Sequence, residues 1–138
     1  MPIPFLPDVK SIAVVGASRN PKKWGHKVFK ALLQYSDVTT YPVNPNAETI
    51  EGRKAYSSIE VLPEVPELVI TVVPPTISEK VVTQAKKLGV NRIWFQPGSE
   101  SEKAKETAKQ ANIQVFSNAC MVVSSQKGEV SPPENPRE

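Results

Sequence analysis

One segment near the start of the chain has the residue types that bind phosphate: Gly16-Ala-Ser-Arg-Asn-Pro-Lys-Lys-Trp-Gly25. Small residues at its beginning let backbone N–H groups approach an anion, and the Ser18 hydroxyl can donate a further hydrogen bond. Cationic side chains crowd the same stretch: Arg19, Lys22, Lys23, His26 and Lys27. The segment favours a phosphate-binding loop; the alternative is a tight turn before a helix whose basic first turn is solvated.

The same region argues against a nicotinamide dinucleotide. The pattern G-x-G-x-x-G is absent, and such cofactors usually need an acidic side chain at the end of the second strand to bind the ribose hydroxyls. That place is held by Tyr41-Pro-Val-Asn-Pro45, and no acid occurs between Asp37 and Glu48. NAD is therefore unfavourable, while the basic loop leaves NADP open.

The sequence contains no recognisable catalytic set. The single cysteine, Cys120, excludes an intramolecular disulfide and a Cys-based zinc site of ordinary spacing. His26 has no Cys or Ser neighbour to activate, and we expect it on the surface. The acids between the second and third expected strands read as solvated charge: Glu48, Glu51, Glu60, Glu64 and Glu67. We therefore expect a non-enzymatic protein without a metal.

Composition and charge limit the class of protein and of ligand further. The chain has 138 residues, 39% hydrophobic and 22% charged, as expected of one globular domain. A net charge of +3, concentrated at one helix start without interleaved aromatic residues, predicts an anionic ligand rather than nucleic acid. The strongest apolar run, 68–73, is far shorter than the roughly 20 residues that span a bilayer. Residues 1–7 do not resemble a signal peptide, so we expect no membrane contact and a cytoplasmic protein.

Two sequence periods alternate along the chain. Short apolar runs predict strands at 11–15, 38–43, 68–73, 91–95 and 113–116. Amphipathic spacing predicts a helix over 24–35, and capping-box spacing begins two more helices at Thr76 and Ser99, the former ending at Gly89. A short helix is expected near 58–62.

This alternation predicts an α/β, Rossmann-like fold: a five-stranded parallel sheet with helices on both faces. We expect the strand order 3-2-1-4-5 and a ligand beyond the carboxyl ends of strands one and four. The site should then gather around 16–25 and 96–99, flanked by Asn44-Pro45 and Pro74-Pro75. The domain is expected to cover 1–123, followed by a disordered tail, 124–138, which has one apolar residue, Val130.

Several short motifs also follow one another in order: Gly16-Ala-Ser18, Asn20-Pro21, Tyr41-Pro-Val-Asn-Pro45, Gly52, Gln96-Pro-Gly98 and Cys120. As a set, they make the chain resemble the stand-alone CoA-binding domain family. It is similar as well to the CoA-binding domain of the succinyl-CoA synthetase alpha subunit and of NDP-forming acyl-CoA synthetases. The resemblance extends over about 11–122.

The resemblance implies a role for each loop. The CoA diphosphate would be cradled by Gly16, Ala17, Ser18, Arg19 and Asn20, and the adenosine would lie against Val43, Asn44 and Pro45, with Lys22 or Lys23 available for the 3′-phosphate. The nucleotide would be walled by Val73, Pro74 and Pro75, and the pantetheine would pass Phe95, Gln96, Pro97 and Gly98. Trp24 would stack on the adenine or cover the helix end. Cys120 would form a mixed disulfide with CoA or be a buried structural cysteine.

The chain also departs from these relatives. The synthetase alpha subunit continues into a domain with a phosphorylated histidine, to which His26 does not correspond, and its basic residue after the second strand is replaced here by Asn46-Ala47. We therefore expect non-catalytic binding of CoA or an acyl-CoA. The alternatives are an NAD(P)-binding regulatory domain, or a subunit of an NDP-forming acyl-CoA synthetase that works with a partner chain.

Overall fold

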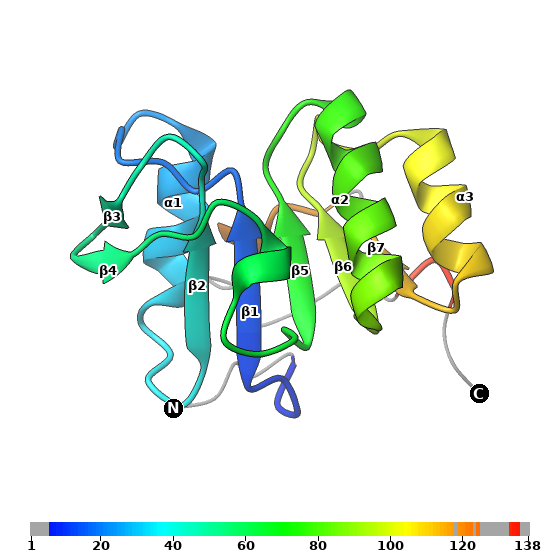
Figure 1. Ribbon diagram of the computed structural model, residues 1–138, viewed down its shortest axis with the longest axis horizontal. Helices are drawn as coiled ribbons and strands as arrows, with labels where there is room; N and C mark the ends of the chain where they lie inside the picture. The colour runs from blue at the N-terminus through cyan, green and yellow to red at the C-terminus, as the bar shows by residue number, and fades with distance from the viewer. Residues whose placement is uncertain (1–5, 118, 123, 125–132, 136–138) are drawn as a thin grey trace.

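The central sheet consists of five parallel strands in a computed structural model that describes residues 6–117, 119–122, 124 and 133–135. The strands are β1 (Ser11–Val15), β2 (Thr39–Val43), β5 (Leu68–Thr71), β6 (Arg92–Phe95) and β7 (Gln114–Phe116). Each lies within one of the predicted apolar runs, and the Rossmann-like α/β class is confirmed (Figure 1).

The strand order is β2-β1-β5-β6-β7, so the expected order 3-2-1-4-5 is wrong. The third strand in sequence, β5, pairs with β1 on the side opposite β2, which makes β2 an edge strand. Pro42 lies in β2 and has no N–H to offer a further strand, while its carbonyl accepts a hydrogen bond from Tyr56 N at 3.0 Å. The topological switch point therefore lies between β1 and β5.

Helices cover both faces of this sheet. α1 (Trp24–Leu32) lies on one face, and α2 (Pro75–Leu88) and α3 (Glu102–Gln110) lie side by side on the other (Figure 1). The residues of β1 alternate between the two cores, Ile12 and Val14 packing on the α1 side and Ala13 and Val15 on the other. This two-sided burial explains the almost continuous apolar runs of the strands.

Between β2 and β5 the chain forms small elements instead of a crossover helix. β3 (Thr49–Ile50) and β4 (Arg53–Lys54) make a hairpin that the sequence did not predict. The 3₁₀ helix η1 (Ile59–Val61) confirms the short helix expected near 58–62.

The starts of α2 and α3 differ from the predicted capping boxes. α2 begins one residue before Thr76 with Pro75 in its first turn and no side-chain cap, because proline already has a helical φ and no N–H to satisfy. Ser101, rather than Ser99, caps α3 by accepting a hydrogen bond from Ala104 N at 2.9 Å. Gly89 ends α2 in the left-handed conformation, as predicted.

Most of the tail expected to be disordered, 124–138, lies outside the described residues. Of its described residues, 133–135 lie along the edge strand β7. Glu134 N donates to Val115 O at 2.7 Å, and Val115 N donates to Asn135 Oδ1 at 2.8 Å. The Glu134 carboxylate also binds Lys105 and Lys109, at 3.1 Å and 2.9 Å. Within the described part of the chain, no helix is long and apolar enough to cross a membrane.

Candidate functional site

The loop after β1 is held by two close backbone approaches. Gly16 has φ +99°, and a Cβ built on it would lie 2.3 Å from Val72 O, at the end of β5. A Cβ on Gly25, in the first turn of α1, would lie 1.9 Å from Gly16 O. Only glycine fits either position, so the end of β5 and the start of α1 both meet the loop directly.

This loop offers a row of backbone donors. Gly16 N donates a hydrogen bond to Val43 O at 3.0 Å. The N–H groups of Ala17, Ser18 and Arg19 have no hydrogen-bond partner among the described residues. The N-terminus of α1 has neither a side-chain cap nor an acid in its first turn. Unpaired N–H groups and the positive end of a helix dipole together favour an anion.

Polar side chains fix the shape of the loop. Ser18 Oγ accepts from Asn20 N at 3.0 Å, and Asn20 Oδ1 accepts from Lys22 N at 3.0 Å. From the end of β2, Asn44 Nδ2 donates to Ala17 O at 2.9 Å. Asn20 and Asn44 therefore shape the loop, whereas the Ser18 hydroxyl hydrogen is left to donate to a ligand.

Two adjoining hollows open beside the loop and share Gly16, Lys23 and Asn44. The first hollow, of about 420 Å³, is completed by Ser18, Lys22, Trp24, Gly25 and Val72. The second hollow, of about 440 Å³, extends between the end of β2 and α2. Together they form an elongated site, and each lies within the size range of small-molecule sites.

The second hollow has an apolar wall and a polar rim. Its apolar wall includes Val43, Ile59, Val73, Ile77 and Val81, and Pro45 and Pro74 border it. Its polar rim is formed by Asn46, Ser57, Ser58, Lys80 and Gln84. No acidic side chain among the described residues lines either hollow. The combination suits a flat aromatic base attached to anionic groups.

The structure brings many of the predicted binding residues together here, but not those after β6. Gln96 is buried and braces the segment that follows β7: Nε2 lies 3.4 Å from Cys120 Sγ, and Oε1 accepts from Met121 N at 2.6 Å. Ser99 Oγ accepts from Val73 N at 3.0 Å. The predicted residues that line neither hollow are Ala17, Arg19, Asn20, Pro75, Gln96, Pro97, Gly98 and Cys120.

Sequence reasoning missed the contribution of α2 to the site. Ile77, Lys80 and Gln84 line the second hollow because β5 lies next to β1, which brings the helix after β5 to the switch point. With the order 3-2-1-4-5, this helix would have been expected elsewhere. The residue that could have indicated the correct strand order is Pro42, because a proline inside a strand predicts an edge strand.

His26 does not lie on the surface as expected. It is 5% exposed, and its Nε2 lies 2.6 Å from Glu51 Oε1. The β3–β4 turn, where Glu51 has φ +50°, brings this carboxylate onto the first turn of α1. Glu51 therefore is not merely a solvated charge, and the pair joins α1 to the hairpin.

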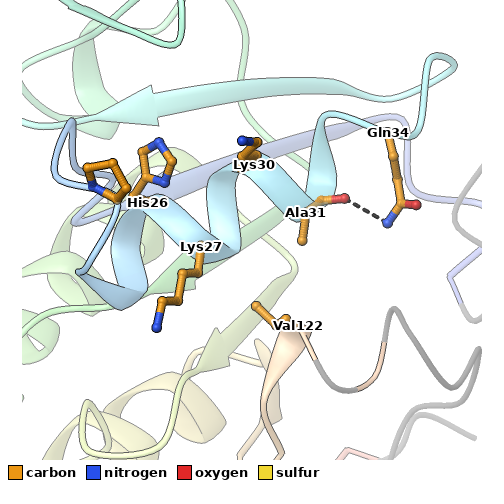
Figure 2. A pocket seen from close by; sticks show the side chains of 7 residues that line it. His26, Lys27, Lys30, Ala31, Gln34 and Val122 are labelled. Atoms are coloured by element: carbon orange, nitrogen blue, oxygen red, sulfur yellow. Dashed lines mark hydrogen bonds between the residues drawn. The ribbon is translucent and has the colours of Figure 1, made fainter.

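A further cavity, of about 550 Å³, runs along α1 toward Val122 (Figure 2). Its basic lining consists of His26, Lys27 and Lys30, and Gln34 at its far end donates to Ala31 O at 2.8 Å. None of its lining residues is shared with the first or the second hollow. It is therefore separate from the loop donors.

Comparison with known proteins identifies the family of the chain. A family model described as a CoA binding domain matches residues 10–126. The alpha subunit of an ADP-forming acetate–CoA ligase II from Pyrococcus furiosus is 39% identical over 84 residues, which are 61% of this chain and 18% of that protein. An ADP-forming acetate–CoA ligase from Methanocaldococcus jannaschii is 32% identical over 120 residues, 81% of this chain and 17% of the ligase. The chain thus spans less than a quarter of either relative.

Solved structures of small proteins match over nearly their whole length. A conserved protein from Pyrococcus furiosus has a TM-score of 0.78 at 38% identity, covering 83% of this chain and 98% of that one. A protein from Pyrococcus horikoshii OT3 has a TM-score of 0.82 at 34% identity, covering 92% and 95%. With the family model matching most of its length, the chain belongs to the CoA binding domain family.

Proposed function

We propose that this protein binds CoA or an acyl-CoA and does not itself catalyse ligation. The observation that carries the proposal is the row of unpaired N–H groups at Ala17, Ser18 and Arg19, beside an uncapped helix N-terminus and two hollows free of acids. The family match and the named activities of the longer relatives support CoA as the ligand.

In the proposed binding mode, the diphosphate occupies the first hollow. The Ser18 N–H and hydroxyl donate to it, the N–H groups of Ala17 and Arg19 lie on the adjoining loop, and Lys22 and Lys23 neutralise its charge. The dipole of α1 adds about 0.3–1 kcal/mol for an anion at this position. A buried aspartate or glutamate would oppose such binding, and neither hollow has one among the described residues.

The adenosine then occupies the second hollow, against Val43, Pro45 and Val73. Trp24 is 52% exposed beside the first hollow, with Lys27 Nζ 4.6 Å from the ring centroid. Because Lys27 covers one face of the indole, we assign Trp24 to the entrance of the site and the apolar wall of the second hollow to the base.

Cys120 is the proposed attachment point for the thiol end of CoA. It is partly exposed, and Gln96 holds its sulfur near the carboxyl end of β6. In the exchange, the Cys120 thiolate attacks one sulfur of a CoA disulfide, a protein–CoA disulfide forms, and the second CoA leaves as its thiolate. Intact-mass measurement after incubation with CoA disulfide would show one added CoA, removable by reductant, and Cys120→Ser would abolish it. An unmodified wild-type protein would leave Cys120 with a structural role.

A second candidate function rests on the relatives themselves. Their names describe ADP-forming CoA ligases, and this chain covers less than a quarter of each. The chain would then be the CoA-binding part of a ligase completed by a partner chain. Co-purification with a nucleotide-binding partner and CoA-dependent ADP formation would support this function. Absence of turnover with the natural partner present would favour the non-catalytic one.

Thermal-shift measurement under reducing conditions tests the ligand. We expect CoA and acetyl-CoA to stabilise the protein, by about 2.7 kcal/mol at 100 times the dissociation constant, and NAD to have no effect. Lys22→Gln should reduce the shift, whereas Lys103→Gln, on the exposed side of α3, should not. A shift with NADP but not with CoA would show that this is an NADP-binding domain.

A further inference from the structure

The second hollow contains positive charge that the protein does not neutralise. Lys80 reaches its rim from α2, and Lys23 reaches it from the start of α1. Neither lysine forms an ion pair with a described residue, in contrast to Lys87 on the same helix, whose Nζ lies 3.4 Å from Glu60 Oε2. Two lysines without an ion-pair partner among the described residues, at a hollow that no described acid lines, predict a ligand group that is itself anionic.

The two hollows are lined by different lysines. Lys22 lines only the first hollow, together with Ser18 of the loop, and Lys80 lines only the second. Lys23 is common to both. A ligand with two separate anionic centres therefore matches the site better than a ligand with one. The second centre must lie beyond an apolar part of the ligand, because Ile59, Ile77 and Val81 form the wall of the second hollow.

Among the described residues, the cations that line the second hollow are Lys23 and Lys80. The end of β2 provides no cation at this hollow, only Asn46 and, after it, Ala47. The nearby hydroxyl and amide groups of Ser57 and Gln84 can donate hydrogen bonds, but they carry no charge. A phosphomonoester has a charge of about −1.5 to −2 at neutral pH. Lys80 is the lysine in the described chain that lines this hollow and not the first.

We infer that Lys80, assisted by Lys23, binds the phosphomonoester on the ribose of the bound nucleotide, so that α2 selects CoA over dephospho-CoA. The inference rests on the proposed function and adds the residue that distinguishes the two ligands. The resemblance made Lys22 or Lys23 available for the 3′-phosphate; the inference gives this role to Lys80 together with Lys23. Lys22 then serves the diphosphate, which CoA and dephospho-CoA have in common.

Titration calorimetry with CoA and dephospho-CoA tests the assignment under reducing conditions. Wild-type protein should bind CoA more tightly. Lys80→Gln should weaken CoA binding about tenfold, as expected for one charge-assisted contact, and leave dephospho-CoA binding unchanged. Lys22→Gln should weaken both ligands by a similar factor. Lys86→Gln is the matched control, because Lys86 is exposed on the same helix and lines neither hollow.

The outcomes separate the inference from the proposed function. If Lys80→Gln keeps the wild-type ratio of the two affinities, or if wild-type protein does not discriminate between them, the role of Lys80 is refuted while CoA binding stands. If wild-type protein binds neither ligand, the proposed function itself fails. Lys80 is exposed, so the variant should unfold at the wild-type temperature, and a melting curve checks this.

Discussion

Replacing Gly25 with alanine should separate α1 from the loop after β1. The new Cβ would lie 1.9 Å from Gly16 O, 2.9 Å from Gly16 C and 3.3 Å from Ala17 Cα. All three atoms belong to the backbone and cannot rotate away. Either the helix start or the loop must therefore move, and the loop carries the unpaired N–H groups.

Two opposing effects determine how much Gly25→Ala changes the free energy of unfolding. Alanine in place of glycine inside a helix stabilises by about 1 kcal/mol. Overpacking costs about 1–3 kcal/mol and more where the neighbour is rigid, as the Gly16 carbonyl is. We expect the clash to prevail, with a net loss of about 2 kcal/mol and a fall in Tm of roughly 6 °C.

Urea denaturation and CoA titration of Gly25→Ala measure both consequences. Stability and CoA affinity should fall together, because one contact supports both the fold and the loop. Lys30→Ala is a control on the exposed side of the same helix and should change neither property by more than a small amount. A Gly25→Ala protein that is as stable as the wild type and binds CoA equally well would refute the close approach of α1.

Two further predictions concern ionisation at opposite edges of the sheet. Burial and the Glu64 carboxylate, whose Oε2 lies 2.5 Å from the hydroxyl oxygen, raise the pKa of Tyr41 from 10.0 to about 12. Stability should therefore decline between pH 10 and 12, and the decline should be smaller in Tyr41→Phe; equal declines in denaturation midpoints would contradict this. Burial raises the pKa of Glu134, but hydrogen bonds from Ser117, Lys109 and Lys105 outweigh it and lower the pKa from 4.5 to about 2. The stability from this contact should be complete above pH 4.5 and lost toward pH 2. If the denaturation midpoints of Glu134→Gln fall with acid in the same way as those of the wild type, this contribution is excluded.

The strands and their burial could be predicted from the sequence because the signal is local. Runs such as 11–15 are apolar on both faces, and only a covered parallel strand accommodates that. The strand order could not be obtained in the same way, since it depends on where a distant strand such as β5 pairs. Pro42 was the one local residue that constrained it, by making β2 an edge.

The candidate binding loop could be predicted from its residues, whereas the wall of the second hollow could not. Gly16 and Ser18 follow a buried strand, a pattern with a direct physical meaning. Lys80 and Ile77 belong to an ordinary amphipathic helix and are brought to the site only by the position of β5. His26 was expected on the surface, but it is buried because the Glu51 carboxylate, from the β3–β4 turn that the sequence did not predict, pairs with it.

At each edge of the sheet, contacts occupy part of the backbone with which an additional strand would pair. At β2, Pro42 lacks an N–H and Tyr56 occupies its carbonyl; at β7, Glu134 and Asn135 occupy the backbone of Val115. An open strand edge is a template on which another copy can pair, and repeated pairing builds fibrils. These contacts therefore leave less of either edge available for pairing between copies of the domain.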